Sequence, residues 1–150
     1  MSYSSSDFAE TKACLVAEIP AKLIHQNVLV TAVDADFSAE RGHGVAVVDL
    51  PSRTISVTIG HLAPGAKTRK HRHSYETIIV INQGTGFSLV EGRRIDWSAG
   101  DAVYIPVWAW HEHQNLDDGK QAVYIACENA PLLQNIGGIA VREEWCSDGN

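Results

Sequence analysis

Cysteine is scarce and unpatterned in this 150-residue chain, which holds only Cys14, Cys127 and Cys146. An odd number of cysteines without a Cys-x-x-Cys pair indicates neither a disulfide framework nor a thiolate zinc site. No segment reaches the ~18 apolar residues of a transmembrane helix, and the N-terminus lacks the basic start and apolar stretch of a signal peptide. These absences predict a protein of the reducing cytoplasm with no membrane partner.

An excess of positive charge is also lacking, because 12 Lys and Arg residues stand against 18 Asp and Glu, for a net charge of −6. Surfaces that bind nucleic acid concentrate Lys and Arg on one face. The one basic cluster, Lys67 to Arg72, is too short to provide such a surface. We therefore expect no nucleic-acid partner.

What the chain does have is the composition of an ordinary soluble domain, with 45% hydrophobic and 20% charged residues. A domain of this length can bury roughly two-thirds of the surface that its unfolded chain exposes, so a conventional core suffices. No repeat, linker or low-complexity tract interrupts it. We predict a single domain over residues 1–150, with its core at about 28–128.

Short β-rich runs, separated by turn residues every eight to twelve positions, follow from Val28 onward and are typical of an all-β sandwich or barrel. Thr54 to Ile59 alternates polar and branched apolar residues, as a strand with one buried face does. Ile78 to Ile81 is apolar at every position, which predicts a strand covered on both faces. The expected strands are Val28–Val33, Val45–Leu50, Thr54–His61, Tyr75–Asn82, Gly86–Glu91, Arg93–Asp96, Ala102–Ile105, His111–Asn115 and Gln121–Cys127.

The two ends of the chain have weaker patterns. Phe8 to Ile19 is compatible with a short helix or an extended arm. Pro131 is placed to open a short helix after the last expected strand, and residues 136–145 could return as a terminal strand.

Four of the seven histidines form two His-x-His pairs, His71 with His73 and His111 with His113. On a strand, residues i and i+2 project from the same face, so two neighbouring strands could bring their imidazoles to one ion. Neutral imidazole suits iron, nickel, copper, zinc or cobalt and tolerates manganese. The alternative is a polar exposed face. His25, His43 and His61 have no partner at metal spacing and are interpreted as surface or hydrogen-bonded residues.

The residues around the two pairs follow a regular spacing. In the first part, five residues separate a glycine from a His-x-His pair, and a glutamate and a second glycine follow. In the second part, five residues separate a glycine from a proline, and a histidine and an asparagine follow. The positions are Gly65, His71, His73, Glu76 and Gly84 in the first part, and Gly100, Pro106, His111 and Asn115 in the second. Over about Ile55 to Cys127 the chain closely resembles the cupin superfamily, whose two motifs have this form.

The resemblance implies an all-β jelly-roll barrel, a double-stranded β-helix, with a metal held in its mouth. By carry-over, His71, His73 and His111 are the metal ligands. Glu76 is a weaker candidate, because only two residues separate it from His73 where the family has three or four. On a regular strand it would point to the other face unless a bulge restores it. Without it, the site has three histidines and open positions. One divalent transition metal per chain is expected, iron first, with manganese, nickel or zinc as alternatives.

Other residues are assigned to the pocket. Trp108 stands where the second motif usually has glycine, and Trp108 and Trp110 either wall the pocket or cover the barrel end. His113 shares a strand face with His111 and is expected to act on a substrate or to lie at the rim. Tyr104 could offer a hydroxyl to the substrate, or belong to the core.

Three functions are compatible with this pattern. The leading hypothesis is an iron(II) dioxygenase that acts on a small aromatic or oxo-acid substrate, since three ligands leave positions for substrate and dioxygen. The alternatives are a metal-dependent binding or sensing module and a metal-assisted isomerase or lyase. Because barrels of this kind expose sheet edges, a homodimer is also expected, with the segment from Phe8 to Val33 crossing to the partner.

Overall fold

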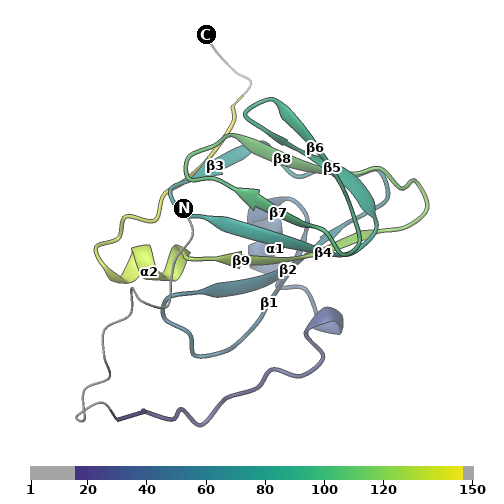
Figure 1. Cartoon of the computed structure of the whole chain (residues 1–150). Coiled ribbons are helices and arrows are strands. Elements are labelled where there is room, and N and C mark those ends of the chain that lie inside the picture. Colours follow the sequence, from purple (N-terminus) through teal and green to yellow (C-terminus); the bar gives the residue numbers. More distant parts are fainter. Residues whose placement is uncertain (1–15, 147–150) are drawn as a thin grey trace, which may run out of the picture.

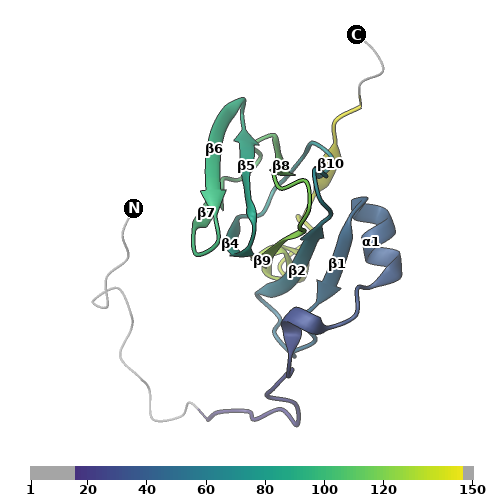
Figure 2. The same cartoon turned by 90° about the vertical axis from the view of Figure 1, so that its right-hand side faces the viewer.

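Two antiparallel five-stranded sheets face each other in the computed structural model, which describes residues 16–146 (Figures 1 and 2). This arrangement confirms the predicted all-β fold of the jelly-roll type. One sheet has the order β1-β2-β9-β4-β7 and the other β10-β3-β8-β5-β6. Their bounds are β1 Gly44–Val47, β2 Ser56–Leu62, β3 His71–His73, β4 Thr77–Gln83, β5 Thr85–Val90, β6 Arg93–Ser98, β7 Ala102–Ile105, β8 His111–Asn115, β9 Ala122–Glu128 and β10 Arg142–Glu144.

Within residues 16–146, helix is limited to short elements, among them α1 (Ala35–Arg41) beside β1 (Figure 2) and the predicted α2 (Ala130–Asn135) (Figure 1). The expected strand at Val28–Val33 is wrong, because Val28–Val30 form a 3-10 turn, η2, that leads into α1. The Asp34 carboxylate caps α1 by accepting a hydrogen bond from the Phe37 amide at 2.8 Å, and Gly42 ends it in the left-handed region. These two caps define where the helix begins and ends.

The core lies between the sheets, where every second residue of a strand points inward. It includes Leu62, Ile79, Ile81, Trp97, Val103, Ile105 and Tyr124. β4 shows the alternation most clearly, since Ile79 and Ile81 are buried while Ile78 and Val80 are 50% and 41% exposed. The expectation that this strand is covered on both faces is therefore wrong. Among the described residues, no layer packs over its outer face.

Two glycines allow large rings to lie against the backbone. Gly60 on β2 is paired with Tyr124 on β9, and a Cβ at Gly60 would lie 2.1 Å from the Tyr124 ring. Gly86 on β5 is paired with Trp97 on β6, and a Cβ there would lie 2.3 Å from the indole and 2.0 Å from the Gln114 carbonyl oxygen. The missing side chains make room for the rings.

Asn115 ties together the loops at one end of the fold. Its buried side-chain amide donates hydrogen bonds to the carbonyl oxygens of Leu62, Ala63 and Lys120 at 3.2, 3.1 and 2.8 Å. Its oxygen accepts from the Asp117 amide at 2.9 Å. All of its hydrogen-bonding groups are used, which accounts for an asparagine at the end of the second motif.

Several expectations concern what lies beyond these elements. Most of Phe8 to Ile19 lies outside the described residues, and residues 16–19 form neither helix nor strand. The terminal strand expected within residues 136–145 is present as β10. No helix in the described part of the chain is long and apolar enough to cross a membrane. The homodimer and the cytoplasmic location stay predictions.

Candidate metal centre and substrate cavity

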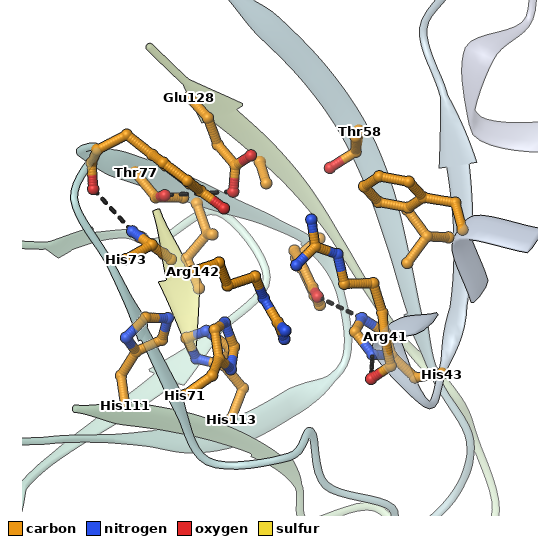
Figure 3. A pocket seen from close by; sticks show the side chains of 16 residues that line it. Arg41, His43, Thr58, His71, His73, Thr77, His111, His113, Glu128 and Arg142 are labelled. Carbon is orange, nitrogen blue, oxygen red and sulfur yellow. Dashed lines mark hydrogen bonds between the residues drawn. The ribbon is translucent and has the colours of Figure 1, made fainter. Parts of the chain in front are cut away.

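Three histidines from two paired strands converge in the space between the sheets (Figure 3). β3 carries His71 and His73, and β8 carries His111, which pairs directly with His71 in the ladder. One ring nitrogen from each lies within 4.8 Å of the others. Within residues 16–146 these are the only His, Cys, Asp or Glu side chains that form a group able to hold a metal ion.

The tautomer of each of these histidines leaves the inner nitrogen free. Nδ1 of His71 lies 2.7 Å from the Arg69 carbonyl oxygen, Nδ1 of His73 lies 2.7 Å from that of Tyr75, and Nδ1 of His111 lies 2.8 Å from that of Ala109. A carbonyl oxygen can only accept, so each Nδ1 carries the hydrogen and each Nε2 keeps a lone pair. Metal-ligating histidines are oriented in this way.

Burial keeps the four clustered imidazoles neutral. It lowers the pKa of His71 to about 2, and the pKa values of His73 and His111 to about 4. Electrostatic repulsion between protonated rings, from His111, is the second cause of the lowered pKa in His71 and in His73. Burial also lowers the pKa of His113 to about 3. Neutral rings with inward lone pairs fit the donor set that a divalent transition metal requires.

These pKa values predict an acid-sensitive metal-free protein. The folded-state pKa values lie below the 6.5 of an ordinary histidine, so below pH 6.5 the unfolded chain binds protons that the folded chain does not. The stabilisation is complete above pH 6.5 and is lost as the pH falls. We expect the free energy of unfolding in urea to drop by about 1 kcal/mol for each of the four histidines between pH 7 and pH 5.5, or about 5 kcal/mol in all. His113→Asn should make this slope shallower, and a flat profile in the unaltered protein would contradict the burial argument.

Glu76 and Tyr104 lie apart from the histidines. Tyr75 and Thr77 face the interior, and the exposed Glu76 between them faces outward, with no bulge to turn it back. Its carboxylate accepts a hydrogen bond from the Tyr104 hydroxyl at 2.7 Å, which raises the pKa of Tyr104. Strand alternation thus separates both candidates from the cavity, and Thr77 takes the inward position.

Trp108 and Trp110 also lie outside the cavity lining. The Arg72 guanidinium lies 4.4 Å from the centre of each ring, so the two indoles hold a cation on the outer surface. Trp108 has a φ of 64°, in the left-handed region, and its amide donates to the His73 carbonyl at 2.8 Å. This backbone conformation explains why glycine is usual at that position of the motif.

The cavity beside the triad has a small inner part and a larger outer part, of about 60 and 280 Å³. His113 is 5% exposed and lines the inner part together with the triad. A cavity of about 150 Å³ can hold a benzene ring, so the outer part has room for one. Six residues line both parts and lie at the boundary between them, called the passage below: Phe37, Arg41, Thr58, Tyr75, Glu128 and Arg142.

Two guanidinium groups reach into this passage from opposite ends of the sequence (Figure 3). Arg41 ends α1 and lies 4.6 Å above the Phe37 ring. Arg142 on β10 pairs with His73, which turns its side chain inward. One of its terminal nitrogens donates to Glu144 at 2.9 Å, whereas its buried Nε has no hydrogen-bond partner within the described residues. An unpartnered buried donor beside a second cation favours an anionic ligand.

Glu128 stands at the same passage. Its carboxylate accepts a hydrogen bond from the Thr77 hydroxyl at 3.3 Å. Burial raises its pKa, against the lowering effect of Arg41 and Arg142. The passage therefore offers both positive charge and one carboxylate that is costly to ionise.

Sequence reasoning found the triad and His113 but missed the charged residues opposite them. Arg41 could have been found through α1, whose Asp34 and Gly42 caps are ordinary helix signals. His43, interpreted as a surface or hydrogen-bonded residue, also lines the cavity and its Nε2 lies 2.8 Å from the Tyr124 hydroxyl. Arg142 and Glu128 carried no local signal, because only the pairing of distant strands turns them inward.

Part of the chain is similar in sequence to a known protein family and to several dioxygenases. Residues 58–127 match the family model described as the cupin domain. The chain is 33% identical over 84 residues to 5-aminosalicylate 1,2-dioxygenase of Comamonas sp. The match covers 56% of this chain and 22% of that protein. It is 29% identical over 114 residues to gentisate 1,2-dioxygenase 1 of Aquipseudomonas alcaligenes, which covers 74% and 33%. The chain thus spans a third or less of these two relatives.

Solved structures show the same fold. A salicylate 1,2-dioxygenase from Pseudaminobacter salicylatoxidans superposes with a TM-score of 0.66 at 24% identity, over 77% of this chain and 37% of that one. A cupin-2 domain from Rhodospirillum rubrum superposes with a TM-score of 0.59 at 18% identity, over 71% and 68%. The matched segment, the facing sheets and the spacing of the histidines point the same way, and residues 58–127 are similar in sequence and fold to a cupin domain.

Proposed function

We propose that this chain is a metal-dependent dioxygenase of the ring-cleaving type, with iron(II) as the preferred metal and a small aromatic carboxylic acid as substrate. The observation that carries the proposal is one cavity in which three histidines with free Nε2 atoms face two guanidinium groups. The relatives named for gentisate and aminosalicylate 1,2-dioxygenation support it.

His71, His73 and His111 would hold the metal, and Glu76 would take no part. When bound, such a metal supplies Lewis acidity and open coordination positions for ring-cleaving chemistry. The protein itself contributes the binding and orientation of the substrate. Arg41 and Arg142 bind its carboxylate by charge-assisted hydrogen bonds, of which the free Arg142 Nε–H supplies one.

The aromatic ring lies in the outer part of the cavity, between Phe37 and Tyr75, because the inner part is too small for it. Its oxygen substituents extend into the inner part, toward the triad. His113 lies beside the triad there and contacts one of these oxygens. Each contact fixes the ring in one orientation, which is how positioning raises a rate.

Oxygen uptake with matched compounds tests the proposal. Protein purified without an affinity tag and loaded with iron(II) should consume dioxygen with gentisate, salicylate or 5-aminosalicylate. Hydroquinone, which is gentisate without its carboxylate, should be a poor substrate. Failure of every aromatic acid to support uptake by folded, iron-loaded protein would reject the activity and leave a metal-dependent binding role or an isomerase or lyase.

Removing one guanidinium tests the carboxylate contact. We expect Arg142→Gln to raise KM for the aromatic acid about tenfold, because a hydrogen bond from a charged group contributes about 1.5–3 kcal/mol. Arg94→Gln is the matched control, since Arg94 is exposed on β6 and lies over the Phe87 ring outside the cavity. Equal KM values for the two variants would contradict the assignment of the carboxylate to Arg142.

A further inference from the structure

His113 differs from the three other histidines of the cluster in the partner of its Nδ1. Those three make this contact to carbonyl oxygens, which can only accept. In His113 the partner is the Ser88 hydroxyl, at 2.7 Å, and a hydroxyl can donate as well as accept. The tautomer of His113 is therefore decided by what else the Ser88 hydroxyl contacts.

Trp97 supplies the deciding contact. Its indole Nε1 lies 3.0 Å from the Ser88 Oγ, and an indole nitrogen is only a donor. Ser88 is fully buried, and among the described residues its hydroxyl has no partners besides Trp97 and His113. The Ser88 hydrogen therefore has one acceptor available, the lone pair on His113 Nδ1. The opposite direction would leave a buried hydroxyl hydrogen unsatisfied.

We infer that Ser88 and Trp97 are positioning residues that fix His113 as the Nε2–H tautomer, so that this histidine presents a hydrogen-bond donor to the cavity. The chain of contacts runs from the Trp97 N–H to Ser88 and from the Ser88 O–H to His113. With a hydrogen on Nε2 and a donor at Nδ1, His113 has no lone pair to offer a metal. Its tautomer is the reverse of that of the three proposed ligands.

The surrounding structure holds the His113 ring in this place. Ser88 and His113 are direct partners in the ladder between β5 and β8. On the other side, the His113 amide donates to the Thr68 Oγ1 at 2.9 Å, and the Thr68 amide donates to the His113 carbonyl at 2.9 Å. The backbone that carries the ring is thus held on both sides, which keeps Ser88 and His113 opposite each other.

The donor gives His113 a defined task that rests on the proposed function. A metal held by the triad would favour loss of the proton from a substrate hydroxyl, and a fixed N–H directed at that oxygen would stabilise the negative charge without reorganisation. A histidine with a free Nε2 would instead compete for the metal. Four histidines lie on the strand pair of β3 and β8. Ser88 and Trp97 make one of them, His113, a hydrogen-bond donor, while the other three keep the lone pair of a metal ligand.

Nitrogen-15 NMR of the histidine side chains in the metal-free protein at pH 7 tests the inference directly. We expect His113, assigned by its loss in His113→Ala, to be protonated at Nε2, and His71, His73 and His111 to be protonated at Nδ1. In Ser88→Ala the ratio of the two His113 tautomers should shift toward Nδ1–H about tenfold, because the donor to Nδ1 is gone. Ser88→Thr keeps the hydroxyl and should restore the unaltered ratio.

Trp97→Phe provides a second variant if Ser88→Ala does not fold, and should shift the His113 ratio in the same direction by a smaller amount. A His113 protonated at Nδ1 in the unaltered protein, or a ratio that Ser88→Ala and Trp97→Phe both leave unchanged, would overturn the inference. Metal content should stay the same in all three variants. Since the NMR readout needs neither metal nor substrate, an absence of dioxygenase activity would reject the proposed function and leave this inference standing.

Discussion

His111→Ala is expected to lower the affinity for the divalent metal by more than about 100-fold. A change in a residue that merely supports a ligand commonly costs 10- to 100-fold, and His111 is one of the three histidines that form the single candidate metal group within residues 16–146. Water would have to replace the lost imidazole. His71→Ala and His73→Ala should have the same effect, and oxygen uptake should be lost with the metal. Elemental analysis normalised to folded protein measures the result.

Two further variants control this experiment. Glu76→Ala changes an outward-facing carboxylate bonded to Tyr104, so it should keep its metal. His113→Ala should also keep the metal but lose activity, because its proposed role is toward the substrate. Metal lost from Glu76→Ala but retained in His111→Ala would show that the ligands are wrongly assigned. Metal lost from His113→Ala as fully as from His111→Ala would indicate a four-histidine site.

Gly86→Ala is expected to destabilise the fold by more than about 3 kcal/mol, at the upper end of what overpacking costs. The added Cβ would lie 2.0 Å from the Gln114 carbonyl oxygen, which is backbone of the neighbouring strand and cannot rotate away. The second clash, with Trp97 at 2.3 Å, would also push the indole off Ser88. Urea unfolding of the metal-free protein measures the loss.

Gly119→Ala is the matched control, since its nearest neighbour would be the Asp117 carboxylate at 3.7 Å and its backbone is not left-handed. It should change the free energy of unfolding by less than about 1 kcal/mol. Gly60→Ala is intermediate, because the ring of Tyr124 is a side chain that can shift. A loss in Gly86→Ala no larger than that in Gly119→Ala would mean that the strands separate easily at this point.

The sequence was most informative where one strand carries its own pattern. The strand Ala102–Ile105 and the strand His111–Asn115 were predicted with the bounds that they have, and the two His-x-His pairs give the inward face of β3 and β8 directly. The parity that places Glu76 outward was visible in the same way. In each case the relevant neighbours lie within a few residues along the chain.

Prediction failed where a residue's environment depends on another part of the chain. Ile78 and Val80 look like core residues, but whether a second layer covers an outer sheet face is decided by segments elsewhere. The aromatic rings of Trp108 and Trp110 were candidates for the pocket. They instead contact the guanidinium of Arg72 on β3, outside the cavity. Arg142 turns inward only because β10 pairs with β3 in one particular register.

The passage between the two parts of the cavity has a consequence for how such a protein can diversify. The three clustered histidines lie within the matched segment 58–127, as do Thr58 and Tyr75 of the passage, whereas its other four residues, Phe37, Arg41, Glu128 and Arg142, lie outside it. Under the proposed roles, the metal ligands and the two guanidinium groups that bind the carboxylate are encoded by separate stretches of the gene. Exchanging α1 and the segment from residue 128 to β10 between homologues could change which acid is accepted while the metal centre is inherited unaltered.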